Sequence, residues 1–190
     1  MAKALFKFAE RPAGAVVIDT TQKSGVFRYL SPFVLPAPPA KLFENLWQFS
    51  KVYKQHLGIL SRLPTEEYYD WRDKGYRASI PYRYPMGKGV IPEYTLWRDK
   101  NLGYIDARKL LYATEYAKNV RQTESFKQLQ QYHARYGDKL ILLDFDAYDH
   151  QVLGMSLIDV INNPNRKMGH AFVLLMMLEN CLEECIELTE

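Results

Sequence analysis

The residues best suited to chemistry begin with an acid and a base seven positions apart, Glu44 and Lys51. Seven residues make nearly two turns of a helix, so these groups would share one face, about 10 Å apart along the axis. Gln48 falls on the same face, and Trp47 lies next to it. This combination is suited to line a polar pocket. The alternative is an ordinary solvated helix face carrying charges of both signs.

Two further groups of residues have chemical potential. Asp144, Asp146, Asp149 and His150 cluster at the end of a predicted strand, where side chains often face a site. Acids also favour turns, because they bond their own backbone. The segment 86–89 (MGKG) could present backbone donors and an ammonium to a phosphate. Its alternative is a purely structural loop.

Familiar catalytic and metal-binding spacings are missing from the sequence. It contains no CxxC pair, HExxH, GxSxG or Walker sequence, so we expect neither a metal site nor a cofactor. The two cysteines, Cys181 and Cys185, are four residues apart and would lie on one helix face. Because that is not disulfide geometry, we expect reduced thiols.

Size and composition indicate one globular domain spanning residues 1–190. The chain is 47% apolar and 25% charged, within the ordinary range. Its 14 Tyr and 3 Trp are aromatic residues with a polar tip, which suit a wet pocket as well as a core. We find no signal peptide and no apolar run long enough to span a bilayer. The expectation is a cytoplasmic protein with no membrane partner.

Positive charge is concentrated in the middle of the sequence. Residues 72–109 hold nine Lys or Arg against four Asp or Glu, although the net charge of the whole chain is only +3. A basic region of this kind is compatible with a phosphate-bearing ligand or a nucleic acid. It is equally compatible with a solvated face balanced by the acidic C-terminal tail.

Periodicity predicts a mainly α fold of the α+β class with a small β-sheet. The strands are expected at 16–21 and 139–146. Helices are expected at about 40–57, 65–75, 104–120, 123–136, 156–162 and 168–188. The first helix would bury a stripe formed by Leu42, Leu46, Phe49, Val52 and Tyr53. Residues 76–94, with three prolines, form an ordered loop too long to be a mere connector.

Taken in order, three segments resemble the signature blocks of the NADAR (YbiA-like) family. The first comprises 29–33 (YLSPF) and 43–53 (FENLWQFSKVY), similar to the family's F-S-N-F and E-H-x-x-Q-x-x-K motifs. The second is 146–148 (DAY), and the third is 166–176 (RKMGHAFVLLM), similar to N-x-L-G-x-x-L-M. Trp97 resembles a family tryptophan between the first two blocks. Departures include Asn45 for the usual histidine, and the sequence is similar to members associated with bacteriophages.

The resemblance implies a YbiA-like domain that hydrolyses an N-glycosidic bond at ribose C1, without a cofactor. Breaking that bond builds positive charge on the sugar, which an ionised carboxylate stabilises. Glu44 is expected in that role. Lys167, with a lowered pKa, would be a nucleophile that forms a Schiff base with the opened ribose. Asp146 would hold ribose hydroxyls or relay a proton to the leaving base.

The remaining residues expected to bind substrate follow from the same blocks. Trp47, Trp97 or Tyr148 would stack on a base, and Arg166, Lys51 and the basic middle would bind a pyrophosphate. Ser31 and Phe33, in the first block, complete the expected set. For Trp47 and Tyr148, simple core packing is an equal alternative.

Three functions remain open from the sequence. The first is removal of ADP-ribose from guanine in nucleic acid, countering a toxin or defence ADP-ribosyltransferase, in the host cytoplasm if the protein is phage-encoded. The second is the same chemistry on a small ribosylamine metabolite of the riboflavin-pathway type. The third is a non-enzymatic module that binds ADP-ribose or nucleic acid or inhibits another protein. The expected partner is thus ADP-ribosylated nucleic acid or an ADP-ribose-like small molecule.

Overall fold

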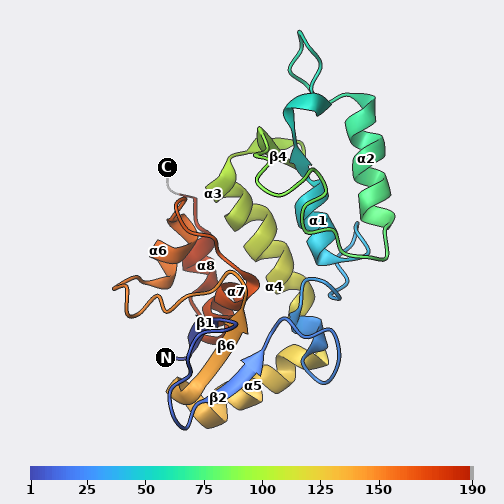
Figure 1. Cartoon of the computed structure of the whole chain (residues 1–190). Coiled ribbons are helices and arrows are strands. Elements are labelled where there is room, and N and C mark those ends of the chain that lie inside the picture. Colours follow the sequence, from blue (N-terminus) through green and yellow to red (C-terminus); the bar gives the residue numbers. More distant parts are fainter. Residues whose placement is uncertain (189–190) are drawn as a thin grey trace.

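A three-stranded parallel sheet lies at the base of the fold, as the computed structural model in Figure 1 shows for residues 1–188. Its strands are β1 (Lys3–Phe6), β2 (Val16–Asp19) and β6 (Leu140–Asp144), in the order β1-β6-β2. The central strand β6 is buried along its whole length, which explains its uninterrupted apolar sequence LILL. Because all three strands run in one direction, their carboxyl ends meet at a single edge.

A second three-stranded sheet is antiparallel and lies away from the first. It consists of β3 (Lys51–Val52), β4 (Tyr94–Trp97) and β5 (Lys100–Leu102). Arg98 and Asp99 connect β4 to β5, and both have positive φ angles, 47° and 61°. Two such residues between paired strands form the kind of tight turn that matches the twist of a hairpin.

One long helical segment separates the two sheets in Figure 1. It begins with α3 (Tyr104–Ala107), continues through a π-helical stretch at Arg108–Ala113 and ends with α4 (Thr114–Val120). The hydroxyl of Thr114 donates to the carbonyl of Lys109, 2.7 Å away, within this stretch. Wide turns of this type are rare and frequently occur at functional sites.

The other helices pack on the two sides of this segment. Helices α1 and α2 lie with the antiparallel sheet, whereas α5 and α7 lie with the parallel sheet (Figure 1). The bounds are α1 Phe43–Phe49, α2 Glu66–Arg77, α5 Glu124–Tyr136, α6 Leu157–Asn162, α7 His170–Leu178 and α8 Leu182–Ile186, with 3₁₀ turns at Arg28–Leu30, Lys54–His56 and Gly137–Lys139.

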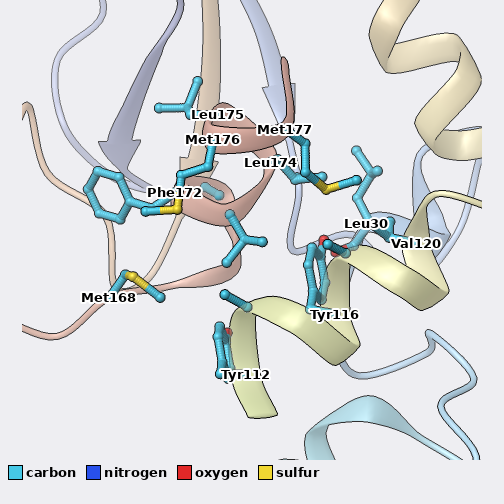
Figure 2. Packing of buried hydrophobic residues seen from close by; sticks show 14 of the residues in the cluster. Leu30, Tyr112, Tyr116, Val120, Met168, Phe172, Leu174, Leu175, Met176 and Met177 are labelled. Atoms are coloured by element: carbon cyan, nitrogen blue, oxygen red, sulfur yellow. The ribbon is translucent and has the colours of Figure 1, made fainter. Parts of the chain in front are cut away.

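Helix α7 is the centre of the hydrophobic core. All nine of its residues are buried, as expected of a helix that is apolar on every side. It contacts α4 on one face and strands β1 and β6 on another, and Figure 2 shows its side chains meeting Tyr112 and Tyr116 of the long segment. The one polar residue of α7, His170, is therefore placed where the core meets the sheet edge.

The predicted helix at 40–57 was wrong in length. Helix α1 ends at Phe49, because the chain then turns to pair Lys51 and Val52 with strand β4. The Ser50 hydroxyl donates to the carbonyl of Leu46 at 2.7 Å, and the Ser50 carbonyl accepts from the Leu96 amide at 2.8 Å. Pairing with a strand more than 40 residues further along the chain thus overrides the local helical pattern.

The predicted helix at 168–188 is divided into α7 and α8. Asn180 has a φ of 57°, a left-handed conformation that ends a helix. Cys181 caps α8 and Cys185 lies within it. The Cys185 thiol donates to Cys181 Sγ at 4.0 Å, and no disulfide joins them. The free cysteines agree with the expectation of unpaired thiols.

The predicted class, a mainly α fold of the α+β type, is confirmed. The strands form two small sheets where one was predicted. Strand β1 and the strands β3 to β5 were not predicted from the sequence. The predicted helices at 65–75, 104–120, 123–136 and 156–162 are present with similar bounds. Within residues 1–188, no helix has the length and apolar character needed to cross a membrane.

Candidate active site

A cavity of about 440 Å³ opens between helix α1 and the carboxyl edge of the parallel sheet. Ligands commonly bind at this edge in sheets of parallel strands. The long helical segment, the loop 78–93 and the residues just before α7 complete its walls. The lining residues are Lys7, Thr21, Lys23, Ser31, Pro32, Phe33, Glu44, Trp47, Gln48, Lys51, Arg83, Tyr84, Tyr104, Arg108, Tyr112, Asp144, Phe145, Asp146, Lys167, Met168, Gly169 and His170.

Helix α1 and the strand β3 that follows it supply a wall of three connected polar side chains. Gln48 Nε2 donates to Glu44 Oε1 at 2.9 Å, and Lys51 Nζ donates to Gln48 Oε1 at 2.7 Å. Glu44 and Gln48 are both buried. The amide of Gln48 therefore bridges the acid and the base. Although Lys51 lies on β3 and not on the helix, it still reaches the position that helical spacing predicted for it.

Burial changes the protonation of both ends of this wall. It raises the pKa of Glu44 to about 7, an effect that Gln48, Lys51, Arg83 and His170 partly oppose. Burial also lowers the pKa of Lys51 to about 8, with Glu44 opposing the shift and Lys167 adding to it. Both groups can therefore gain or lose a proton near neutral pH, the property that general acids, bases and lysine nucleophiles require.

Trp47 forms the aromatic side of the same wall. The ammonium of Lys51 lies 4.7 Å from the centre of the Trp47 ring, and the ring meets Tyr112 edge to face at 5.0 Å. Tyr112 belongs to the π-helical stretch, and burial raises the pKa of its phenol well above 10. The phenol consequently stays protonated at neutral pH and can serve as a neutral donor.

Asp146 lies on the opposite side of the cavity from this wall, together with two cations. Arg83 is 3.0 Å from Asp146 Oδ2, and Lys167 is 4.0 Å from Oδ1. The Asp146 carboxylate is about one-third exposed, so solvent and a ligand can both reach it. This arrangement places two cations beside one accessible carboxylate.

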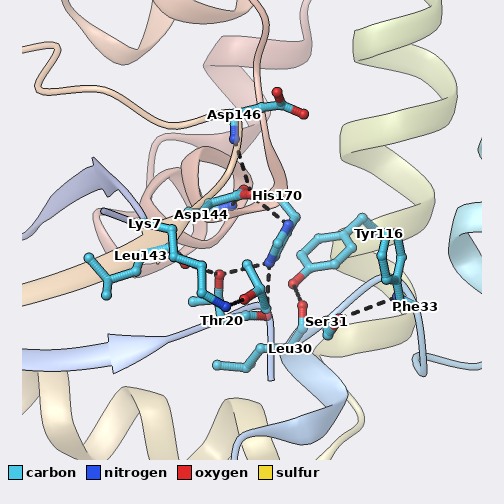
Figure 3. A network of polar contacts seen from close by, with 12 residues as sticks. Lys7, Thr20, Leu30, Ser31, Phe33, Tyr116, Leu143, Asp144, Asp146 and His170 are labelled. Carbon is cyan, nitrogen blue, oxygen red and sulfur yellow. Dashed lines mark hydrogen bonds and ion pairs between the residues drawn. The ribbon is translucent and has the colours of Figure 1, made fainter. Parts of the chain in front are cut away.

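Asp144 and His170, which both line the cavity, belong to a buried polar network (Figure 3). His170 Nδ1 is 3.0 Å from Asp144 Oδ2, and Nε2 is 3.0 Å from the Thr20 carbonyl and 2.7 Å from the Thr20 hydroxyl. That hydroxyl donates to the Leu143 carbonyl at 2.8 Å. Both ring nitrogens thus face acceptors, which requires a doubly protonated imidazolium.

The pKa values of the pair agree with this assignment. Burial favours the neutral imidazole, but the Asp144 carboxylate outweighs it and raises the pKa of His170 above 6.5. Burial likewise raises the pKa of Asp144, but the His170 cation and the Ala171 amide outweigh it and lower that pKa to about 2. A fixed positive charge therefore lies next to Glu44, whose ionised form it stabilises.

Gly169 allows Asp144 to approach the start of helix α7. A Cβ atom at this position would lie 2.0 Å from Asp144 Oδ2, much closer than van der Waals contact. Asp144 Oδ2 uses this space to accept from the Ala171 amide at 3.1 Å, and the carboxylate also favours the positive end of the helix. The glycine of the RKMGH segment thus has a steric role in the network.

The loop 78–93 is held over the cavity by Asn45. Its side-chain amide donates to the carbonyls of Ala78 and Ile80 at 3.3 and 2.9 Å, and its oxygen accepts from the Tyr82 amide at 2.9 Å. Asn45 is fully buried. The next residue of the loop is Arg83, so Asn45 fixes the backbone that directs Arg83 towards Asp146.

The residues expected from the sequence divide into two sets. Those that line the cavity are Glu44, Asp146, Lys167, Ser31, Phe33, Trp47 and Lys51. The structure also distinguishes two neighbours, because Lys167 lines the cavity whereas the Arg166 guanidinium lies 5.1 Å from the Tyr148 ring.

Trp97, Tyr148 and Arg166 do not line this cavity. Trp97 lies in the β4–β5 hairpin and lines a separate depression with Arg72 and Arg98. Tyr148 packs on Phe172 with ring centres 4.9 Å apart, as in the core-packing alternative. Strand β6 ends at Asp144, and the chain beyond it directs Asp146 but not Tyr148 to the cavity.

Several lining residues were missed by sequence reasoning. Lys7 carried no signal, and Arg83 was noted only as one of the nine cations of the basic middle, because both lie outside periodic patterns and approach the site only through the fold. Asp144 belonged to the acidic cluster that we singled out, and His170 to the third signature block. Asp149, in contrast, pairs with Lys3 at 3.2 Å and accepts from the amides of the turn that follows it. Asp149 therefore forms a turn and is not part of the cavity.

The basic middle of the sequence does not converge on the cavity. Of its nine cations only Arg83 and Arg108 line it. Arg108 is buried and donates to the carbonyls of Asn163 and Arg166, so it supports the chain just before Lys167. The segment 86–89 does not line the cavity either. The cations that line the cavity are spread along the sequence, at Lys7, Lys23, Lys51, Arg83, Arg108 and Lys167.

No set of three or more His, Cys, Asp or Glu side chains within residues 1–188 is arranged to hold a metal ion. Comparisons with protein-family models, curated proteins and solved structures gave no match. The NADAR resemblance therefore stays a prediction that rests on the residues quoted for it.

Proposed function

We propose that the protein is an N-glycosidase that hydrolyses the bond between ADP-ribose and guanine in nucleic acid, and so counters a toxin or defence ADP-ribosyltransferase. The observation that carries the proposal is the buried Glu44, which has a pKa of about 7 and is connected through Gln48 to Lys51 in a cavity. In its ionised form, Glu44 stabilises the oxocarbenium-like sugar and orients the attacking water.

The other lining groups fit the rest of such a substrate. Asp146 accepts from ribose hydroxyls or relays a proton to the leaving guanine. Arg83 and Lys167, beside it, bind the pyrophosphate, for which the planar fork of an arginine is well suited. Trp47 and Phe33 offer aromatic faces to a base. Ser31 keeps the Phe33 backbone in place through a hydrogen bond of 3.4 Å.

For a route through a lysine nucleophile, Lys51 is a better candidate than Lys167. A nucleophilic lysine must lose its proton near neutral pH, and burial lowers the pKa of Lys51 to about 8. The Lys167 side chain is 67% exposed. In this route the neutral amine of Lys51 attacks C1 and the bond from C1 to guanine breaks, so guanine leaves with one of the amine protons. The ribose ring opens as its oxygen takes the other proton, which leaves an imine between Lys51 and C1. Water then hydrolyses the imine, which releases ADP-ribose and regenerates the amine.

The test is incubation with guanine-ADP-ribosylated single-stranded DNA, with release of ADP-ribose followed by mass spectrometry. We expect Glu44→Gln, which keeps the size and removes the charge, to lower the rate at least about 100-fold. Glu66→Gln, on the exposed start of α2, is the matched control and should match the wild type. Release that does not depend on Glu44, or no release, would contradict the proposal.

The lysine route has its own readout. Borohydride reduces an imine to a stable amine, so a trapped adduct should form in the wild type and in Lys167→Met but not in Lys51→Met. The absence of any adduct would leave direct attack by water on the sugar as the reaction. An adduct that requires Lys167 would restore the original assignment of the nucleophile.

A further inference from the structure

A cluster of exposed aromatic rings lies next to the cavity mouth. Phe6, Phe8 and Phe145 are 43%, 73% and 37% exposed, and their rings form a chain with centres 5.6 Å and 6.1 Å apart. Large aromatic side chains are seldom left in water in adjacent positions without a function. None of these three residues belongs to the signature blocks that led to the proposed function.

The fold itself builds this cluster at the edge where the cavity opens. Phe6 ends β1 opposite Asp144, and Phe145 follows the end of β6. The Lys7 amide donates to the Asp144 carbonyl, and the Ala9 amide donates to the Phe6 carbonyl, both within 3.0 Å. This tight turn places Phe8 beyond the sheet, where it has no core to join.

Cations accompany the rings. The ammonium of Lys7 lies 4.9 Å from the centre of the Phe145 ring, and the guanidinium of Arg83 lies 5.6 Å from it. Both residues and Phe145 also line the cavity. Across the mouth, Lys23 lies 5.2 Å from the Phe33 ring. Aromatic faces and cations therefore continue from the cavity wall onto the open surface without interruption.

We infer that Phe6, Phe8 and Phe145, with Lys7, form a platform that binds the single-stranded nucleic acid flanking the base held in the cavity. The inference rests on the proposed function and specifies its substrate as a polymer. Unpaired bases stack on aromatic rings while cations contact the backbone, a combination typical of single-strand binding. Paired bases in a duplex do not expose the faces that such stacking needs.

The test is fluorescence anisotropy with a labelled, unmodified single strand of about 12 nucleotides, a length within the usual range for one binding site. Phe8→Ala should weaken binding at least about fivefold, because it removes a ring on which a base stacks. Phe8→Tyr keeps a ring and should restore most of the affinity. Ile59→Ala, at a position 98% exposed away from the cavity, is the matched control and should bind like the wild type.

Several results would overturn the inference. These are equal affinity of Phe8→Ala and the wild type, equal affinity for duplex and single strand, and no binding by the wild type. Self-association that depends on Phe8, measured by sedimentation, would show that the cluster is a contact between copies of this chain. The nucleic acid in this assay carries no ADP-ribose, so its binding is measured independently of hydrolysis. Binding without hydrolysis would support the platform and contradict the proposed function, and hydrolysis without binding would do the opposite.

Discussion

His170 and Asp144 form an ion pair with only 3.0 Å between Nδ1 and Oδ2, in a region where both side chains are almost fully buried. The second ring nitrogen is hydrogen-bonded to Thr20, the residue that follows strand β2. The pair thereby connects two strands of the parallel sheet to the first turn of helix α7. It also places a positive charge under Glu44.

Replacement of Asp144 by Asn should destabilise the protein strongly. The change leaves the His170 imidazolium buried without its counter-ion, which costs about 3–5 kcal/mol in comparable cases. Urea unfolding would measure the loss. The pKa of His170, followed by NMR, should fall below 6.5 in this variant. Glu124→Gln, which removes one partner of an exposed pair with Lys127, should change stability by less than about 1 kcal/mol.

The same pair predicts how stability depends on pH. The pKa of Asp144 is lowered from 3.8 to about 2, so its contribution is present above 3.8 and is lost as the pH falls towards 2. The pKa of His170 is raised above 6.5, so its contribution is complete below 6.5 and is lost as the pH rises through the folded value. Melting temperatures from pH 2 to 9 should show both losses in the wild type but not in a variant lacking the pair.

Gly169→Ala should destabilise the protein by about 1–3 kcal/mol, the usual cost of overpacking. Its Cβ would overlap Asp144 Oδ2, and either the carboxylate or the start of α7 would have to move. Gly103→Ala is a matched control, because its Cβ would meet nothing within 4 Å. Thermal unfolding of both variants is the measurement. Equal stabilities would show that the network tolerates the displacement.

Asn45→Ala should loosen the loop 78–93. It removes the partners of three backbone groups, at Ala78, Ile80 and Tyr82, and each buried group left without a partner costs about 1–3 kcal/mol. Limited proteolysis should cleave the loop faster, and hydrogen exchange at the Tyr82 amide should accelerate. Asn101→Ala, at an exposed position of β5, should change neither rate. An unchanged loop would mean that the Arg83–Asp146 ion pair is sufficient to hold it.

Lys51→Met should shift the pH dependence of any activity that requires ionised Glu44. In the wild type, activity should rise as the pH passes through about 7, the pKa of Glu44. The Lys51 cation favours the ionised acid, as do Arg83 and His170, so its removal raises the Glu44 pKa and moves the rise to higher pH. Lys51→Arg keeps the charge and should restore the original position. If Lys51→Met left the pH profile unchanged, the charge of Lys51 would have no effect on the pKa of Glu44.

Sequence reasoning succeeded where local interactions decide the outcome. The predicted helices 123–136 and 156–162 begin where local capping is available, because the side chains of Thr123 and Ser156 accept from backbone amides one turn later. The spacing of Glu44 and Gln48 on one helix was also correct, since it depends only on the period of the helix. Lys51 also lies near them, as predicted, but strand β3 positions it and not the helix.

Most of the missed features depend on contacts between distant parts of the chain. Nothing near Lys7 or Arg83 in the sequence indicates that one follows the end of β1 and the other lies in a loop held by Asn45. The length of α1 could not be predicted either, because a strand 40 residues later ends it.

The sequence by itself determined the α+β class, most helices and the chemical types of the acid, amide and base on the α1 wall. These features follow from periodicity, capping and side-chain chemistry, which act over a few residues. Only the tertiary structure decided which charges are buried, and therefore that Glu44 has a pKa of about 7 and Asp144 one of about 2. The physical reason is that desolvation and Coulomb interactions depend on distances through space, which folding alone establishes.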